Sequence, residues 1–590
     1  MLNPQQNNKR EKYDISGIWK FKVDKDKSGE KENWQINFKN TLDIAVPGSW
    51  NEQLEAEGLM HYTGTAWYSH DFFVPQNLNG KRIWIRIGSA DYYSKLWING
   101  KYVGDNLGGF LPIDFEITDF VRTGEKNNLK LLVNNELSSD TIPQGISTEE
   151  YEDENRLREE TYPAARFDFS PYGGIHRPVY IYATPKQYVK DVTIKTSVSS
   201  AAKGKVKLNI DFGKTTAGKV VLDISGNGEV IIKEFALNGT QFETEFEINE
   251  CRFWSCDDPY LYELKIELFE EETCLDEYTI KFGVREIKIE GFKLLLNNKP
   301  IFLKGFGKHE DFPVIGKALN LPLLIKDFSL MKWINANSFR TSHYPYAEEW
   351  LDFADEKGFL VVNEVPAVSL DFRKTNGSTL KNHKDFIKKL INRDKNHPSV
   401  IMWAPGNEPN LVGEESYYNG SGDNYWKEIC EYTKQLDPTR PVTIPNCQRA
   451  GKDDPVFNYS DVISLNRYYG WYENPGMINT AVKRFEDEMD YISEKYKKPI
   501  FVTEFGADTM PGFHSISDQM FTEEYQSELL KKYCELIESK DYTIGEHVWN
   551  FADFKTPQHF RRVVLNLKGV FNRNRDPKLA AFTLKKIWGK

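Results

Sequence analysis

The chain has 590 residues, with 76 lysines and arginines against 87 aspartates and glutamates, giving a formal net charge of −11. This acidic balance argues against nucleic acids or anionic membranes as partners, because surfaces that bind them are usually basic. Six scattered cysteines without a C-x-x-C pair predict neither a disulfide framework nor a zinc ribbon. The polar N-terminus and the lack of a long apolar run lead us to expect a cytoplasmic protein with no membrane span.

The first part of the chain, to about residue 185, has the pattern of short β-strands. Segments 82–87 and 93–98 are rich in aromatic and β-branched residues and are bounded by turn-forming residues. The second of them is followed by Asn99-Gly100, a dipeptide that closes tight hairpins. The pattern predicts a β-sandwich.

Between about residues 186 and 284, apolar and polar residues alternate more strictly. Val206, Leu208, Ile210 and Phe212 alternate with polar residues, which places one face of a strand on a core and the other in water. We therefore expect a second, smaller sandwich.

After residue 285 the pattern changes to alternating strands and helices. Apolar strand candidates end at Gly307, Thr341, Asn363, Trp403, Pro445, Asn466, Thr503 and Trp549. Helical stretches separate most of them, such as the one with Leu351 and Ala354 on one face and Gly358 as its stop signal. Asp576-Pro577 is expected to open the last helix, as a capping residue followed by proline. Eight strands with helices over about 300 residues predict a (β/α)8 barrel.

Two glutamates follow buried strands of this predicted barrel. Glu408 comes shortly after the fourth strand candidate, and Glu504 comes directly after the seventh. Catalytic groups of such barrels lie where the strands end, so the two carboxylates should meet across the barrel mouth. A facing pair of this kind suits glycoside hydrolysis, in which one carboxyl protonates the leaving oxygen and the other attacks the anomeric carbon or activates water.

The chain resembles glycoside hydrolase family 2 over nearly its whole length, and within that family the bacterial β-glucuronidases. The motifs that carry the resemblance are Val46-Pro-Gly-Ser-Trp50, Asp168-Phe-Ser-Pro-Tyr-Gly-Gly-Ile-His176, Arg340-Thr-Ser-His343-Tyr-Pro, Asn407-Glu408-Pro, Asn466-Arg-Tyr-Tyr-Gly-Trp-Tyr472, Glu504-Phe-Gly-Ala-Asp and Trp549-Asn-Phe-Ala-Asp-Phe. The resemblance implies a jelly-roll, sugar-binding-like β-sandwich over residues 1–185, an immunoglobulin-like sandwich over 186–284 and a catalytic (β/α)8 TIM barrel over 285–590.

The same resemblance assigns roles to individual residues. It implies that Glu408 is the general acid/base and that Glu504 is the nucleophile of a retaining exo-β-glycosidase. Further residues are expected to contact or orient the sugar, namely Asp168, His343, Asn407, Tyr468, Tyr472 and Trp549. The substrate implied is a β-D-glucuronide or an oligosaccharide that ends in one.

Recognition of the sugar's C6 carboxylate is expected from a group late in the chain. Asn566 and Lys568 match the Asn-x-Lys pair by which β-glucuronidases hold that carboxylate, and an ammonium and an amide are suitable donors for it. Arg562 could add a second cation. The neutral hydroxymethyl group at C6 of a glucoside or galactoside could not form a charge–charge interaction with Lys568.

Several alternatives stay open from the sequence. A β-galactosidase of the same family is disfavoured by Lys568, whereas a β-galacturonidase is not, because galacturonate carries the same carboxylate. A sugar-binding protein without activity would be expected to lack one glutamate, and both are present. The reaction needs no metal or cofactor, and whether an accessory ligand such as flavin mononucleotide binds is undecided. The family resemblance implies a homo-oligomer, either a dimer or a tetramer.

Overall fold

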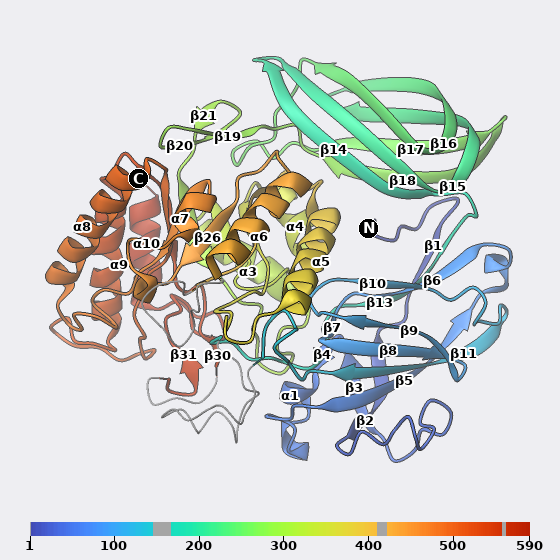
Figure 1. The fold of residues 1–590 in the computed structure, drawn as a ribbon, viewed down its shortest axis with the longest axis horizontal. Coiled ribbons are helices and arrows are strands. Elements are labelled where there is room, and N and C mark those ends of the chain that lie inside the picture. Colours follow the sequence, from blue (N-terminus) through green and yellow to red (C-terminus); the bar gives the residue numbers. More distant parts are fainter. Residues whose placement is uncertain (1, 146–166, 410–421, 557–561, 590) are drawn as a thin grey trace.

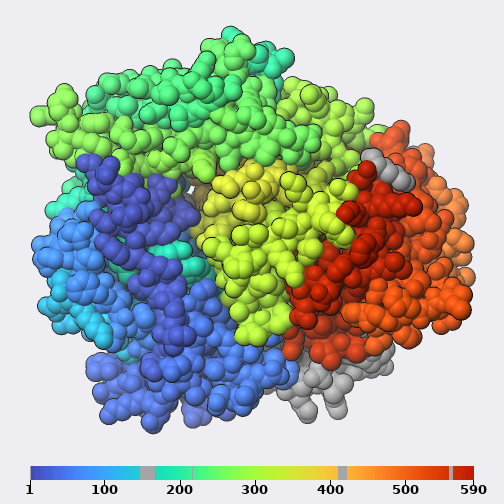
Figure 2. Space-filling model, turned by 180° about the vertical axis from the view of Figure 1, so that it is seen from behind, coloured from blue at the N-terminus to red at the C-terminus, as the bar shows by residue number. Residues whose placement is uncertain are grey.

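The computed structural model describes residues 2–145, 167–409, 422–556 and 562–589. Two β-sandwiches and one α/β barrel follow one another along the chain (Figure 1). Seen from behind, both sandwiches contact the barrel (Figure 2). Within the described residues, no helix combines the length and apolar character needed to cross a bilayer.

The N-terminal sandwich contains sheets of four, six and three strands. Its strands are β1 Glu11–Asp14, β2 Gly17–Asp24, β3 Leu42–Val46, β4 Gly48–Ser49, β5 Thr65–Val74, β6 Arg82–Ile87, β7 Ala90–Asp91, β8 Tyr93–Ile98, β9 Lys101–Leu107, β10 Ile113–Glu116, β11 Glu125–Asn134, β12 Gly174–Ile175 and β13 Val179–Thr184, with one short helix, α1 Trp50–Gln53. The expected hairpin joins β8 and β9 as an antiparallel pair. Asn99 and Gly100 both have positive φ, 52° and 76°, as the tightest hairpin turns require.

The second sandwich is one antiparallel sheet whose long strands curve around a single apolar core. Its strands are β14 Val189–Ser200, β15 Lys203–Gly226, β16 Glu229–Asn249, β17 Tyr262–Glu270 and β18 Thr273–Phe282. Val206, Leu208, Ile210 and Phe212 are all buried in that core, which confirms the alternation seen in the sequence.

The barrel is an eight-stranded parallel sheet. Its strands are β22 Leu303–Gly307, β23 Ser338–Arg340, β24 Leu360–Glu364, β25 Val400–Ala404, β26 Thr443–Asn446, β27 Val462–Asn466, β28 Ile500–Glu504 and β29 Thr543–Val548. Six neighbouring pairs follow chain order, and a seventh joins the first strand, β22, to the last, β29. A parallel bridge between Trp403 of β25 and Val442, just before β26, links the remaining two strands. The predicted barrel is therefore confirmed.

Helices pack outside the strands. They are α3 Leu321–Trp333, α4 Glu348–Lys357, α5 Gly377–Asp394, α6 Gly422–Leu436, α7 Val456–Tyr459, α8 Ile478–Tyr496, α9 Glu523–Glu538 and α10 Leu579–Trp588. Gly358 ends α4 with φ 75°, as expected of a left-handed C-cap glycine. The expected start of the last helix is wrong, because α10 begins at Leu579 with Lys578 as its N-cap. Pro577 instead pairs with Phe571 in a β-bridge.

A small sheet covers the N-terminal end of the barrel strands (Figure 1). It consists of β19 Ile287–Glu290, β20 Lys293–Leu296 and β21 Lys299–Pro300. Leu294 and Leu296 are buried in one cluster with the barrel residues Leu303, Leu360 and Met402. This end is filled by apolar packing, so the polar side chains that could do chemistry lie at the opposite, C-terminal end.

Candidate active site

The residues proposed from the sequence all lie in the described part of the chain and form one connected group. Glu504 is the last residue of β28, and Glu408 lies in the loop after β25. Both strands are buried along their whole length, so rigid elements hold both carboxylates at the C-terminal end of the barrel.

Glu504 is held as a carboxylate by two strong donors. The Arg340 guanidinium donates to its Oε1 at 2.5 Å, and the Tyr468 hydroxyl donates to its Oε2 at 2.6 Å. Only 3% of Glu504 is exposed, so water screens these contacts little. Donors to both oxygens fix the position of this carboxyl.

Glu408 is in the opposite electrostatic situation. Burial, together with the nearby negative charge of Glu504, raises its pKa to about 7, and one hydrogen bond from Asn466 Nδ2 at 2.9 Å opposes this rise. Its backbone is left-handed, with φ 50°, which is uncommon for a residue other than glycine. Its amide donates to Pro445 O at 2.8 Å, which fixes the loop to β26.

A network of polar and charged side chains lies beside Glu504. Arg340 also donates to Glu364, whose other oxygen lies 2.6 Å from His343 Nδ1. The His343 ring stacks on Trp549 with centroids 5.1 Å apart, and its Nε2 lies 3.9 Å from Glu504. This network orients His343 and Trp549 beside the carboxylate.

The N-terminal sandwich contributes Asp168 to the site. The Asp168 carboxylate accepts from Arg562 Nη2 at 2.8 Å and from Asn566 Nδ2 at 2.9 Å. Burial alone would raise the pKa of Asp168, but the Arg562 guanidinium and its hydrogen bond lower it well below the usual range. Asp168 therefore reaches the barrel mouth as an ion, as its proposed role requires.

Lys568 lies in the same group and is 1% exposed. Its ammonium donates to Asp508 and, at 2.9 Å, to the Tyr472 hydroxyl, which also accepts from Arg562. An ammonium has three N–H donors, so one is left for a ligand. The buried Nε of Arg562 has no hydrogen-bond partner among the described residues. Both unused donors belong to cations, which suits a bound carboxylate.

Sequence reasoning left out four residues that hold this site together. Arg340 and Asn466 end β23 and β27, Glu364 ends β24, and Asp508 follows β28. Asn466 also donates weakly to Asn407 Oδ1, at 3.3 Å, which joins Asn407 to the group. Polar residues at the ends of otherwise apolar strands were the signal that could have identified them.

The arrangement places a carboxyl whose pKa is raised, Glu408, near one that receives donors on both oxygens, Glu504, with donors for an anionic sugar nearby. Among the described residues, one grouping has side chains close enough to hold a metal ion, namely Asp352, Asp355 and His397. It lies on α4 and before β25, at the other end of the barrel strands.

Comparisons with known proteins agree with this geometry. Three sequence models of glycosyl hydrolases family 2 match the chain: the sugar binding domain over residues 13–185, a further family 2 domain over 187–285 and the TIM barrel domain over 287–590. A beta-glucuronidase from Paenibacillus borealis is 39% identical, over 100% of this chain and 98% of that protein.

Solved structures agree over the same extent. The beta-D-glucuronidase of Dictyoglomus thermophilum is 39% identical with a TM-score of 0.89, covering 100% of this chain and 99% of that one. The beta-glucuronidase of Ruminococcus gnavus in complex with D-glucuronic acid is 36% identical with a TM-score of 0.90 and the same coverage. Family models, relatives and solved structures together span the two sandwiches and the barrel, and the chain belongs to glycosyl hydrolases family 2.

Proposed function

We propose that the protein is a retaining exo-β-glycosidase that hydrolyses β-D-glucuronides to D-glucuronate and an alcohol. The observation that carries the proposal is the contrast between two carboxyls at one end of the barrel. Glu504 receives donors on both oxygens, whereas the pKa of Glu408 is raised to about 7. Two carboxyls in different environments of this kind can take different roles, one as general acid and the other as nucleophile.

The reaction follows from these states. Glu504 attacks the anomeric carbon while Glu408 gives its proton to the leaving oxygen, which forms a covalent glycosyl-enzyme and frees the alcohol. Glu408, now ionised, takes a proton from a water molecule that attacks the same carbon and releases Glu504. Tyr468 and Arg340 hold the nucleophile during both steps, and Asn407 is proposed to bond the sugar 2-hydroxyl. A carboxyl separation of about 5–5.5 Å is expected for this mechanism.

The uronate specificity is proposed to come from Lys568, Arg562 and Asn566. The unused donors of the two cations support this assignment, and so does the complex of the R. gnavus relative with D-glucuronic acid. A neutral galactoside would leave the remaining N–H donors of these two buried cations without a charged acceptor. A β-galacturonidase is the second candidate, because its substrate differs from a glucuronide only in the direction of the C4 hydroxyl.

The stereochemistry of the product tests hydrolysis and mechanism together. Because two displacements occur at the anomeric carbon, the first sugar released from a β-glucuronide should be the β-anomer. Proton NMR within the first minutes, before mutarotation, measures it. An initial α-anomer would exclude the covalent intermediate and the role of Glu504.

The pH profile tests the role of Glu408. A general acid must be protonated to act, and its pKa is raised to about 7, so kcat/KM should be constant just below pH 7 and fall tenfold per unit above it. The substrate should be an alkyl glucuronide, whose poor leaving group needs the proton. Glu408→Gln, assayed on a nitrophenyl glucuronide with a good leaving group, should lack this basic limb. A flat wild-type profile to pH 9 would contradict the assignment.

Three further points are part of the proposal. We place domain boundaries near residues 185 and 284, which the extents of the matched family domains support. We propose that the working form is a homo-oligomer, dimer or tetramer, which analytical ultracentrifugation would measure. The net charge of −11 argues against nucleic acids as ligands.

A further inference from the structure

A cavity lies where the second sandwich meets the N-terminal end of the barrel. Its walls come from β14, from the segment after β18, and from the loops that precede β25 and β26. It is a small, partly open cavity; the empty space in and around it, open solvent included, amounts to about 310 Å³. The lining side chains are mainly polar, and none of them belongs to the candidate active site.

Every ionisable residue in the lining is a cation. The four are Lys195, Arg285, Lys395 and Arg440, and no carboxylate lines the cavity. From outside the lining, Asp191 pairs with Lys395 and Asp437 pairs with Arg440. Among the described residues, neither Lys195 nor Arg285 forms a direct ion pair, and the carboxylates of Asp437 and Asp355 act on Arg285 only without a direct contact.

Arg285 is the more unusual of the two, because it is only 5% exposed. Its Nε and Nη2 donate to the backbone oxygens of Pro398 and Val400 at 3.1 and 2.7 Å, which holds the guanidinium in place without neutralising it. Burial and the neighbouring Arg440 guanidinium lower its pKa to about 9. Because arginine stays protonated in proteins, this buried charge is unfavourable until an anion approaches it.

We propose that this cavity binds a small oxyanion of the phosphate or sulfate type between Lys195 and Arg285. The ligand would bridge the two domains, since Lys195 belongs to β14 of the second sandwich while Arg440 and Lys395 belong to the barrel. Buried cations bind such oxygens through charge-assisted hydrogen bonds, and Nη1 of Arg285 is not used by its two contacts with backbone oxygens. Binding should stabilise the fold and leave turnover unchanged.

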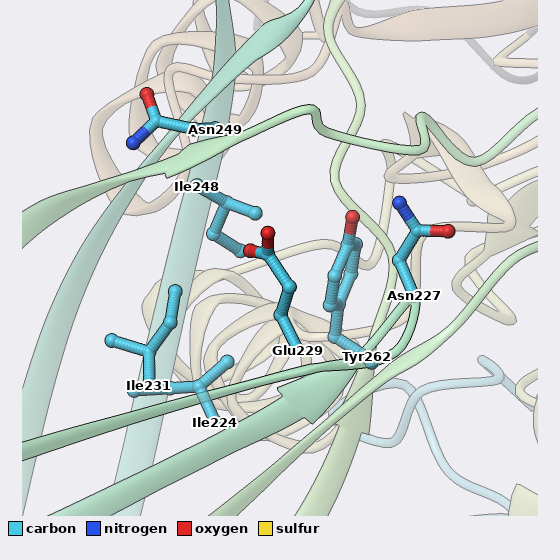
Figure 3. A pocket seen from close by; sticks show the side chains of 8 residues that line it. Ile224, Asn227, Glu229, Ile231, Ile248, Asn249 and Tyr262 are labelled. Carbon is cyan, nitrogen blue, oxygen red and sulfur yellow. The ribbon is translucent and has the colours of Figure 1, made fainter.

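A second cavity serves as a comparison. It lies at the end of the second sandwich, lined by Ile224, Ile231, Ile248 and Tyr262 together with Asn227, Asn249 and Glu229 (Figure 3). Its only ionisable groups are a carboxylic acid and a phenol, neither of which would bind an anion. Of these two cavities, the one at the domain junction has the cationic lining.

Thermal unfolding of the full-length enzyme in sodium phosphate, with sodium chloride holding the ionic strength constant, tests the proposal. The melting temperature should rise with phosphate and then level off, as binding to one site requires. Sulfate should stabilise the protein in the same way if the site binds any tetrahedral oxyanion. If the site requires a protonated oxygen on the ligand, only phosphate should stabilise the protein. Non-specific stabilisation by these salts also exists, but it does not saturate.

Lys195→Ala provides the decisive variant, because Lys195 is half-buried without an ion pair and its loss should leave the fold intact. Losing one hydrogen bond from a charged donor should weaken phosphate binding about tenfold or more, measured by isothermal titration calorimetry. Lys190→Ala, an exposed lysine of the same strand outside the cavity, is the matched control and should bind phosphate like the wild type. A response that does not saturate in the wild type, or equal affinities in the two variants, would overturn the proposal.

Discussion

Glu504→Gln is expected to abolish hydrolysis of β-glucuronides by several orders of magnitude, while the protein stays folded. The amide cannot attack the anomeric carbon, so no glycosyl-enzyme can form. Folding should survive because Arg340 keeps Glu364 as a buried carboxylate partner. Steady-state kinetics and a thermal melt of the same preparation measure the two effects.

Rescue of activity by azide distinguishes the roles of the two glutamates, because the anomeric configuration of the glucuronosyl azide should differ between their alanine variants. In Glu504→Ala, azide can take the place of the carboxylate and should yield an α-glucuronosyl azide in one displacement. In Glu408→Ala the covalent intermediate still forms from a substrate with a good leaving group, and azide should then give the β-product. Glu473→Gln, at a partly exposed glutamate paired with Arg484, is a control expected to keep full activity. The same anomer from both alanine variants would refute the division of roles.

Lys568→Ala should lower kcat/KM for a glucuronide by roughly ten- to a few-hundred-fold. A hydrogen bond to a charged group contributes about 1.5–3 kcal/mol, and every 1.4 kcal/mol corresponds to about a factor of ten. Activity on the matching glucoside should change little, because that sugar has no carboxylate to lose. The ratio of the two kcat/KM values is the quantity to measure, since general damage cancels in it.

The structure adds a control for this variant. The Tyr472 hydroxyl accepts from both Lys568 and Arg562, so Tyr472→Phe removes a neighbour of the cations and keeps both charges. Its effect on the ratio should be much smaller than that of Lys568→Ala. If Lys568→Ala lowers both activities equally, Lys568 acts through its ion pair with Asp508 and is structural.

Most of the architecture could be predicted because each strand carries its own signal. The barrel strands are continuous apolar runs followed by polar residues, and the sandwich strands alternate. The start of the last helix could not be predicted from local rules. The Lys578 ammonium donates at 2.9 Å to Asp553, Thr509 O and Leu567 O, and its amide donates to Val570 O. These distant contacts hold residues 577 and 578 extended, so the capping pattern one turn earlier is not used.

The site could be predicted in part for the same reason. Glu408 and Glu504 were found because each follows a buried strand and lies in a family motif. The pairing of Arg340 with Glu504 joins residues 164 positions apart, and Asp168 meets Arg562 across 394 positions and two domains. No periodicity encodes such contacts, which arise only when the barrel closes and the N-terminal sandwich docks on it.

Hydrolysis of four nitrophenyl β-glycosides, the glucuronide, galacturonide, glucoside and galactoside, tests the central claim most directly. These sugars differ only at C4 and C6, and the leaving group is the same. Lys568 and Arg562 have unused donors that suit a carboxylate, and the chain's relatives include beta-glucuronidases. The glucuronide should therefore have the highest kcat/KM and the two neutral sugars the lowest. A preference for the galacturonide would move the assignment to the other uronide, and a preference for the glucoside or galactoside would contradict the proposed role of the cations altogether.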